Sequence, residues 1–339
     1  MTNKLPVTLL AHIDDVAVFQ TAAFSSGSTF SDIISSSTVS DDNIVNLSDF
    51  GAEKKQSGSQ IEASYGELNL GLHVNDEAAT VLDNRMRLLA TINEQVANLS
   101  LESKQHLRIK RLHWVNQVHG KRIHDIDATA LSMEPMAADA MVSQQKGVGL
   151  AIMTADCVPI VLYQPASGQI AAIHAGWQGL ACGVIQATVQ HFTESGQIKA
   201  WIGVCISQQN YEVDSPVRDQ LLAGCIENQL LTESEIDNFD PLYVISSDGV
   251  TKNDSQIQCL NNTTDQRLND ATVEVQKIKI DLPKLAADQL SAAGVTLDNS
   301  SPTHCSYADD HYYSYRRQTH LQQPATGRMA LVIVRGNSI

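Results

Sequence analysis

Residues 153–179 read MTADCVPIVLYQPASGQIAAIHAGWQG, and this stretch decides how the chain folds. It contains two apolar runs, Val158 to Tyr163 and Ile170 to His174, separated by the turn sequence Pro-Ala-Ser-Gly. Two short apolar runs joined by such a turn predict an antiparallel β-hairpin. We therefore expect Cys157 and His174, at the ends of these runs, to lie at neighbouring strand ends.

The pattern around this hairpin mixes further strands and helices. One predicted helix carries Leu82, Met86 and Leu89 at helical spacing, and Ala79 and Ile92 extend that apolar stripe. Hairpins are frequent and a strict β-α-β alternation is missing, which favours an α+β fold with mixed β-sheets. Further strands are expected at residues 112–118, 148–153, 201–206 and 329–334, and helices at 76–96, 179–192, 216–222 and 282–293.

Composition bounds the class of protein. A chain of 339 residues that is 43% hydrophobic can bury a large core, and we expect a single domain over 1–339 with polar insertions at about 24–64 and 246–276. The net charge of −15 argues against nucleic acid or an anionic membrane as partner. The absence of a signal-peptide pattern and of CxxC pairs favours a cytoplasmic protein with reduced thiols. A monomer is expected.

Three side chains in matching contexts suggest a metal site. His119, Cys157 and His174 each follow an apolar run, and the two histidines are followed closely by glycine. Two imidazoles and a thiolate suit zinc and leave one coordination position open. The same set resembles a blue-copper centre, but no His-x-His occurs, which disfavours multicopper oxidation. Without metal, Cys157 would be a nucleophile, with a histidine as base and Asp156 nearby.

Three arginines near the C-terminus are candidates for anion binding. Arg316, Arg317 and Arg328 lie within 13 positions of one another in an acidic chain. Guanidinium groups bind phosphate and carboxylate with two parallel hydrogen bonds. Surface pairing with Asp and Glu is the alternative interpretation. Asn69 and Arg85 are weaker candidates, because capping or solvent exposure also explains them.

Seven motifs in order resemble the YfiH family, the bacterial relatives of the human laccase-domain protein. The matching segments are 69–76, Asn84-Arg85, Gln117-Val-His119-Gly, Thr154-Ala-Asp-Cys157-Val-Pro, His174-Ala-Gly-Trp177, Tyr-Ser-Tyr-Arg316-Arg317 and Thr326-Gly-Arg328. The resemblance covers about 65–215 and 277–335.

The resemblance implies a layered α/β/β/α sandwich and zinc held by His119, Cys157 and His174. It implies phosphorolysis of adenosine, inosine, guanosine or methylthioadenosine, together with adenosine deamination. We expect a nucleoside and phosphate as small-molecule partners and catalytic roles for Cys157, His174 and Asp156. Substrate contacts are expected from Asn69, Arg85, Gln117, Arg316, Arg317 and Arg328.

The chain also departs from the family pattern. Gln178 stands where the family has arginine, an N-terminal arginine is missing from the stretch that begins at Gln20, and Gly203-Val-Cys-Ile replaces Gly-Pro-Ala-Ile. Metal binding is therefore the firmer expectation and phosphate binding the weaker one. The alternatives are an amidase that edits a peptidoglycan precursor, a copper-dependent polyphenol oxidase and a non-catalytic binding protein.

Overall fold

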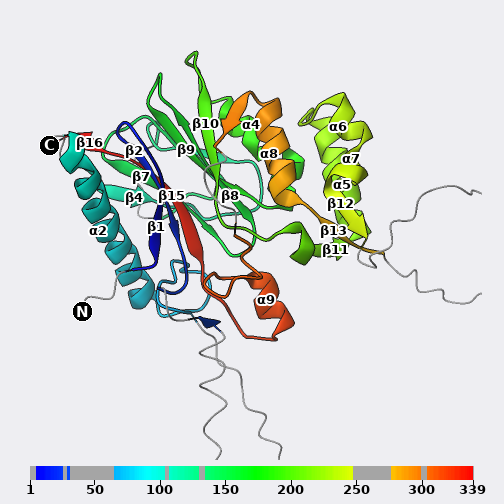
Figure 1. Ribbon diagram of the computed structural model, residues 1–339, viewed down its shortest axis with the longest axis horizontal. Helices are drawn as coiled ribbons and strands as arrows, with labels where there is room; N and C mark the ends of the chain where they lie inside the picture. The colour runs from blue at the N-terminus through cyan, green and yellow to red at the C-terminus, as the bar shows by residue number, and fades with distance from the viewer. Residues whose placement is uncertain are drawn as a thin grey trace, which may run out of the picture.

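The computed structural model describes residues 5–25, 29–30, 65–103, 107–129, 134–246, 276–298 and 304–338. The two polar insertions expected at about 24–64 and 246–276 lie almost wholly outside these residues. Two large mixed sheets form the centre of the described structure, and helices lie on either side of them (Figure 1).

The first sheet has five strands and joins both ends of the chain. Its outer strand β4 runs parallel to β7, and the other pairs are antiparallel. In spatial order the strands are β1 (Val7–Ile13), β2 (Val16–Thr21), β15 (Met329–Arg335), β7 (Val148–Thr154) and β4 (Arg111–His113).

The second sheet has six strands and contains the predicted hairpin. Its strands β8 and β9 pair antiparallel, with Val158 opposite Ala175 and Pro159 opposite His174, which confirms the hairpin. In spatial order the strands are β14 (Val295–Leu297), β10 (Ile198–Ile202), β8 (Val158–Gln164), β9 (Gln169–Ala175), β6 (Ala140–Ser143) and β5 (Ile123–Asp125).

Short sheets and helices complete the described part. The small sheets pair β11 (Glu212–Asp214), β13 (Lys277–Ile280) and β12 (Val244–Ser246), and β16 (Asn337–Ser338) with β3 (Leu107–Arg108). The helices are α2 (Ala78–Ser103), α3 (Trp177–Cys182), α4 (Val184–Val189), the 3-10 turn η1 (Gln208–Asn210), α5 (Ser215–Glu227), α6 (Glu233–Asp237), α7 (Phe239–Tyr243), α8 (Leu282–Ala292) and α9 (Tyr315–His320).

Three apolar clusters give the fold its layers. Leu88 and Ile92 of α2 pack with side chains of the five-stranded sheet, and a second cluster joins the inner faces of the two sheets. The third joins the six-stranded sheet to α3, α4, α5 and α8. Because β7, β8 and β9 are covered on both faces, they are continuous apolar runs that are buried throughout. The α+β fold with α/β/β/α layering is therefore confirmed.

Several predicted elements differ in extent. The strand expected at 112–118 covers only Arg111–His113, and the one expected at 201–206 is Ile198–Ile202. The helix expected at 179–192 is divided at Gly183, whose φ of 81° interrupts it. Only glycine adopts that backbone angle readily. The helix after Pro216 extends to Glu227, further than predicted.

The apolar stripe predicted for α2 was correct at Ile92, which is buried, and in part at Leu89, which is half-buried, but wrong at Ala79, Leu82 and Met86. Leu82 and Met86 are 51% and 70% exposed, whereas Val81, Leu88 and Ile92 are buried. The face toward the sheet also carries Asn84, whose amide donates to the backbone carbonyl of Asn69. Polar side chains with internal partners interrupt the apolar periodicity of the buried face, so the periodicity alone placed Leu82 and Met86 on the wrong side of the helix.

We predict that Leu88→Ala lowers the free energy of unfolding by about 2–5 kcal/mol, because it leaves a cavity between α2 and the sheet. Leu82→Ala on the same helix is the matched control, and its effect should stay within about 0.5 kcal/mol because the side chain is exposed. Chemical denaturation followed by circular dichroism measures both. Equal losses would contradict the assignment of the buried face.

Candidate metal centre

The turn between β7 and β8 places Cys157 directly before β8, an inner strand of the six-stranded sheet. The chain crosses here from one sheet to the other, and Asp156 adopts a φ of 105° within the crossing. The pairing of Val158 with Ala175 brings Cys157 beside Gly176. A Cβ atom at Gly176 would lie 3.1 Å from the Cys157 Sγ and 3.4 Å from the His119 Cδ2. Glycine at this position therefore lets the thiol and imidazole approach.

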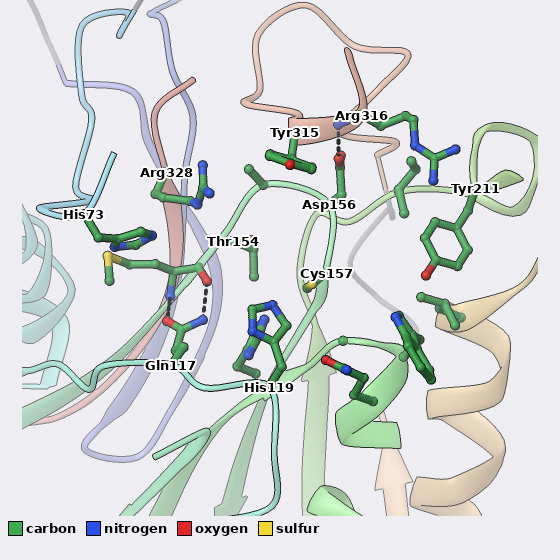
Figure 2. Close-up of a pocket in the computed structure, with 18 of the residues that line it drawn as sticks. His73, Gln117, His119, Thr154, Asp156, Cys157, Tyr211, Tyr315, Arg316 and Arg328 are labelled. Carbon is green, nitrogen blue, oxygen red and sulfur yellow. Dashed lines mark hydrogen bonds between the residues drawn. The ribbon is translucent and has the colours of Figure 1, made fainter. Parts of the chain in front are cut away.

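The three predicted ligands converge. One donor atom each of His119, Cys157 and His174 lies within 4.8 Å of the others. The two imidazoles pack edge to face, with ring centroids 4.7 Å apart, and Figure 2 shows Cys157 beside His119. His174 is buried, Cys157 is half-buried and His119 is exposed, so the cluster is open on one side. Within the described ranges it is the only group of metal-capable side chains this close together.

Asp139, which the sequence analysis did not select, holds two of these ligands. Its fully buried carboxylate accepts the Nδ1 hydrogen of His174 at 2.9 Å, which leaves Nε2 as the donor atom. It also accepts the backbone N–H groups of residues 118, 119 and 120 at 3.1, 2.8 and 2.7 Å. These bonds fix the turn in which His119 has a φ of 60°. A carboxylate behind a ligating histidine is typical of zinc sites.

The charges of the cluster are coupled. Burial by itself raises the pKa of the Cys157 thiol, but the charge of His174 and hydrogen bonds from both histidines lower that pKa to about 6. Burial lowers the pKa of His174, but the charge of Cys157 and the bond to Asp139 raise it to about 9. The pair is therefore a thiolate and an imidazolium at neutral pH. A thiolate and two imidazoles fit zinc, with one coordination position left open.

A cavity of about 510 Å³ lies against the cluster. This is within the size range of pockets for small molecules. The wall includes four further residues that the sequence analysis selected: Gln117, Asp156, Arg316 and Arg328. Three more lining residues with chemistry to offer were missed, His73, Thr154 and Tyr211.

Two of the selected lining residues use their polar atoms within the protein. The amide of Gln117 bonds the backbone N–H and carbonyl of Met153 at 2.9 and 2.7 Å, as Figure 2 shows. The carboxylate of Asp156 accepts the Ser306 hydroxyl and the Arg316 backbone N–H, both at 2.7 Å. These contacts hold the cavity wall in place. The predicted catalytic role of Asp156 and substrate contact of Gln117 stay predictions.

Three selected residues do not line the cavity. The amide of Asn69 bonds the backbone N–H groups of Gly71 and Arg328. Arg85 donates to the Leu70 carbonyl and lies over the Trp114 ring, at 4.2 Å from its centroid. Arg317 donates to four backbone carbonyls between residues 306 and 312. The polar groups of all three are engaged within the protein, and their contact with substrate stays a prediction.

The missed Asp139 left one signal in the sequence. It is the only charged residue in the segment 135–143, PMAADAMVS, which leads into a buried strand. A single carboxylate in such a run needs internal donors. The donors are backbone groups of a distant turn, so the sequence did not identify them.

A family model described as multi-copper polyphenol oxidoreductase laccase matches residues 51–240 and 243–336. The chain belongs to this family. Its curated relatives include the purine nucleoside phosphorylase YfiH of Escherichia coli, 39% identical over 47% of this chain and 59% of that protein. Another is the purine nucleoside phosphorylase SCO2081 of Streptomyces coelicolor, 34% identical over 53% of this chain and 70% of that protein. The alignment with the Escherichia coli protein thus spans less than two thirds of its length.

Two solved structures share the fold. Protein NMB0706 of Neisseria meningitidis matches with a TM-score of 0.59 and 24% identity, over 98% of this chain and all of that one. YlmD of Geobacillus stearothermophilus matches with a TM-score of 0.58 and 21% identity, over 95% of this chain and 93% of that one. The two-sheet architecture is therefore a fold that these solved proteins share.

We predict that Asp139→Asn weakens zinc binding about 10- to 100-fold. The carboxylate accepts hydrogen bonds with both oxygens, whereas an amide would turn its NH₂ group toward some of the same N–H donors and no longer hold His174 in place. Competition with a chromophoric chelator measures the affinity. Asp125→Asn is the matched control, since Asp125 also accepts backbone N–H groups but contacts no ligand of the cluster. Equal zinc affinities for the two variants would contradict the role of Asp139.

Zinc affinity should rise with pH. Between about pH 6 and 9, Cys157 is already a thiolate and His174 must lose one proton to bind, so affinity increases about tenfold per pH unit. Below pH 6 the thiol is protonated too, and the slope steepens to about two protons. Proton release measured by calorimetry in buffers of different ionisation enthalpy tests this. No proton release at pH 7.5 would contradict the ion pair.

Proposed function

We propose that the protein is a zinc-dependent enzyme of purine nucleosides, which cleaves adenosine, inosine, guanosine or methylthioadenosine with phosphate and also deaminates adenosine. The observation that carries the proposal is the His119, Cys157 and His174 cluster, open toward a cavity of about 510 Å³. The names of the curated relatives, purine nucleoside phosphorylase, support the choice of substrate class.

The residues of the chain prepare this cavity for a polar reaction. Zinc, when bound, supplies Lewis-acid activation of an oxygen nucleophile. Asp139 fixes the tautomer of His174 and the turn of His119, so little reorganisation is needed on binding. Asp156, directly before Cys157, ties the crossing turn to the segments at 306 and 316, which fixes the cavity wall beside the cluster. The substrate is thus positioned by a rigid frame.

A copper-dependent polyphenol oxidase, which the family description names, is the second candidate. Multicopper oxidation needs several metal sites rich in histidine. Among the described residues, His119, Cys157 and His174 are the one group of metal-capable side chains that lie close enough together to share a metal ion. A single His₂Cys cluster suits zinc or one copper ion. We therefore favour the nucleoside reaction with zinc.

Partners and location follow from the same proposal. A nucleoside and phosphate are the expected small-molecule partners, and we propose a cytoplasmic monomer that binds no nucleic acid. Among the described helices, none is both long and apolar enough to cross a membrane.

The test is incubation of zinc-loaded protein with adenosine or inosine, with and without phosphate, and chromatography of the products. We expect adenine and hypoxanthine only when phosphate is present, and inosine from adenosine in either case. Cys157→Ala should lose bound zinc and both activities. Cys182→Ala should retain them, because the Cys182 thiol donates to the Gly179 carbonyl and is not one of the three candidate ligands. No turnover by the zinc-loaded protein would contradict the proposal, and unchanged zinc content in Cys157→Ala would contradict the ligand assignment.

A further inference from the structure

The two sides of the cavity differ in chemistry. Figure 2 shows His73 and Arg328 on one side of Cys157 and His119, and Tyr211 and Arg316 on the other. The cluster of candidate ligands thus lies between a cationic wall and an aromatic wall.

Arg328 is a cation without a carboxylate partner among the described residues. Its guanidinium donates only to the backbone carbonyls of Thr326 and Gly327, at 3.2 and 3.0 Å. Its stem lies on Gly71, where a Cβ atom would come within 2.8 Å of the Arg328 Cγ, and His73 follows two residues later. Burial and the charge of Arg328 lower the pKa of His73. The negative charges of Cys157 and Asp156 act on the guanidinium, but among the described residues neither group is hydrogen-bonded to it. A half-buried guanidinium that bonds only backbone carbonyls favours an anionic ligand.

Thr154 adds an unused hydroxyl to the same wall. Thr154 is only 2% exposed, and its Oγ1 has no hydrogen-bond partner among the described residues. The register of β7 and β15 pairs Thr154 with Met329, so the hydroxyl lies next to the segment that carries Arg328. Buried hydroxyl groups are ordinarily hydrogen-bonded, and an orphan that lines a cavity indicates a ligand atom.

The opposite wall suits a flat ring. Tyr211 and Trp177 line the cavity, and both pack in the same apolar cluster as Leu282, which lines it too. Arg316 there is already engaged: its guanidinium donates to the Glu212 carbonyl at 2.6 Å and lies 5.6 Å from the centroid of the Tyr211 ring. Its donors are therefore partly used, and the face offered to the cavity is mainly aromatic and apolar. Aromatic faces of this kind stack on nucleobases.

We propose that Arg328, His73 and Thr154 form the subsite for the phosphate co-substrate, and that the purine ring binds against Tyr211 and Trp177 on the other side of the cluster. This rests on the proposed function and adds the direction in which the substrate lies. Displacement at the ribose C1′ requires nucleophile and leaving group on opposite sides of that carbon. The two walls supply that arrangement, with C1′ near the cluster.

The bonding changes follow from this orientation. A phosphate oxygen uses a lone pair to form the bond to C1′, and the bond from C1′ to the purine N9 breaks with its electron pair going to the purine. The proton of HPO₄²⁻ balances the charge on the released purine. The products are ribose 1-phosphate and the free base, and no oxidant or reductant is involved.

The first experiment measures binding of inorganic phosphate to the zinc-loaded protein by calorimetry, with sulfate as competitor. Arg328→Gln should weaken phosphate binding about tenfold or more, and Arg328→Lys should retain part of it because the charge remains. Arg316→Gln, the same change on the opposite wall, should alter the dissociation constant by less than about twofold. Equal affinities for wild type and Arg328→Gln, or a larger loss in Arg316→Gln, would overturn the subsite.

A second pair of variants separates ligand contact from a structural role. Thr154→Val keeps the shape and removes an unbonded hydroxyl, so the melting temperature should stay the same or rise while phosphate binding weakens. Tyr211→Ala should weaken inosine binding about fivefold or more and leave phosphate binding unchanged. A lower melting temperature in Thr154→Val with unchanged phosphate affinity would show that the hydroxyl serves the fold, against the proposal.

The outcomes distinguish the subsite from the activity. If the protein binds phosphate through Arg328 but turns over no nucleoside, the subsite stands and the proposed function falls. If nucleosides are cleaved and Arg328→Gln leaves the KM for phosphate unchanged, the function stands and the subsite is overturned.

Discussion

The buried carboxylate of Asp139 is the contact on which the geometry of the site depends. It accepts four hydrogen bonds, one from the His174 imidazole and three from consecutive backbone N–H groups of the turn that carries His119. A carboxylate buried without donors would destabilise the fold strongly, so its position and the turn determine each other. Asp139 directly precedes β6, which pairs with the strand of His174. The six-stranded sheet therefore fixes the position of Asp139, and its hydrogen bonds fix the two histidines.

The strands were predictable and the buried face of the long helix was not. Strands such as β7, β8, β9 and β15 are covered on both faces, so their sequences are continuous apolar runs that local patterning identifies. Helix α2 buries Asn84 and half-buries Arg85, each bonded to the backbone of residues 69 and 70. The partners lie 15 residues away, and periodicity cannot register a polar side chain that is satisfied by a distant segment.

The same limit applies to the site. The three candidate ligands could be found because each follows an apolar run and the hairpin brings two of them together. The role of an arginine depends on where its carbonyl and carboxylate partners lie, which adjacent residues do not reveal. Arg317 binds backbone carbonyls of the 306–312 segment, while Arg328 lines the cavity, although both were equal candidates in the sequence. Asp139 depends on a turn 20 residues earlier in the chain.

The balance of charge explains why Arg328 matters in this chain in particular. Gln178, at the exposed rim of the cavity, is neutral and adds no positive charge to it. A divalent zinc ion would be balanced by the Cys157 thiolate and the Asp139 carboxylate. The Asp156 carboxylate accepts the backbone N–H of Arg316, so the positive Arg316 side chain belongs to the same part of the cavity wall as this negative charge. The charges of Cys157 and Asp156 also act on Arg328, but its guanidinium bonds only backbone carbonyls among the described residues, and an anion beside it would complete the balance.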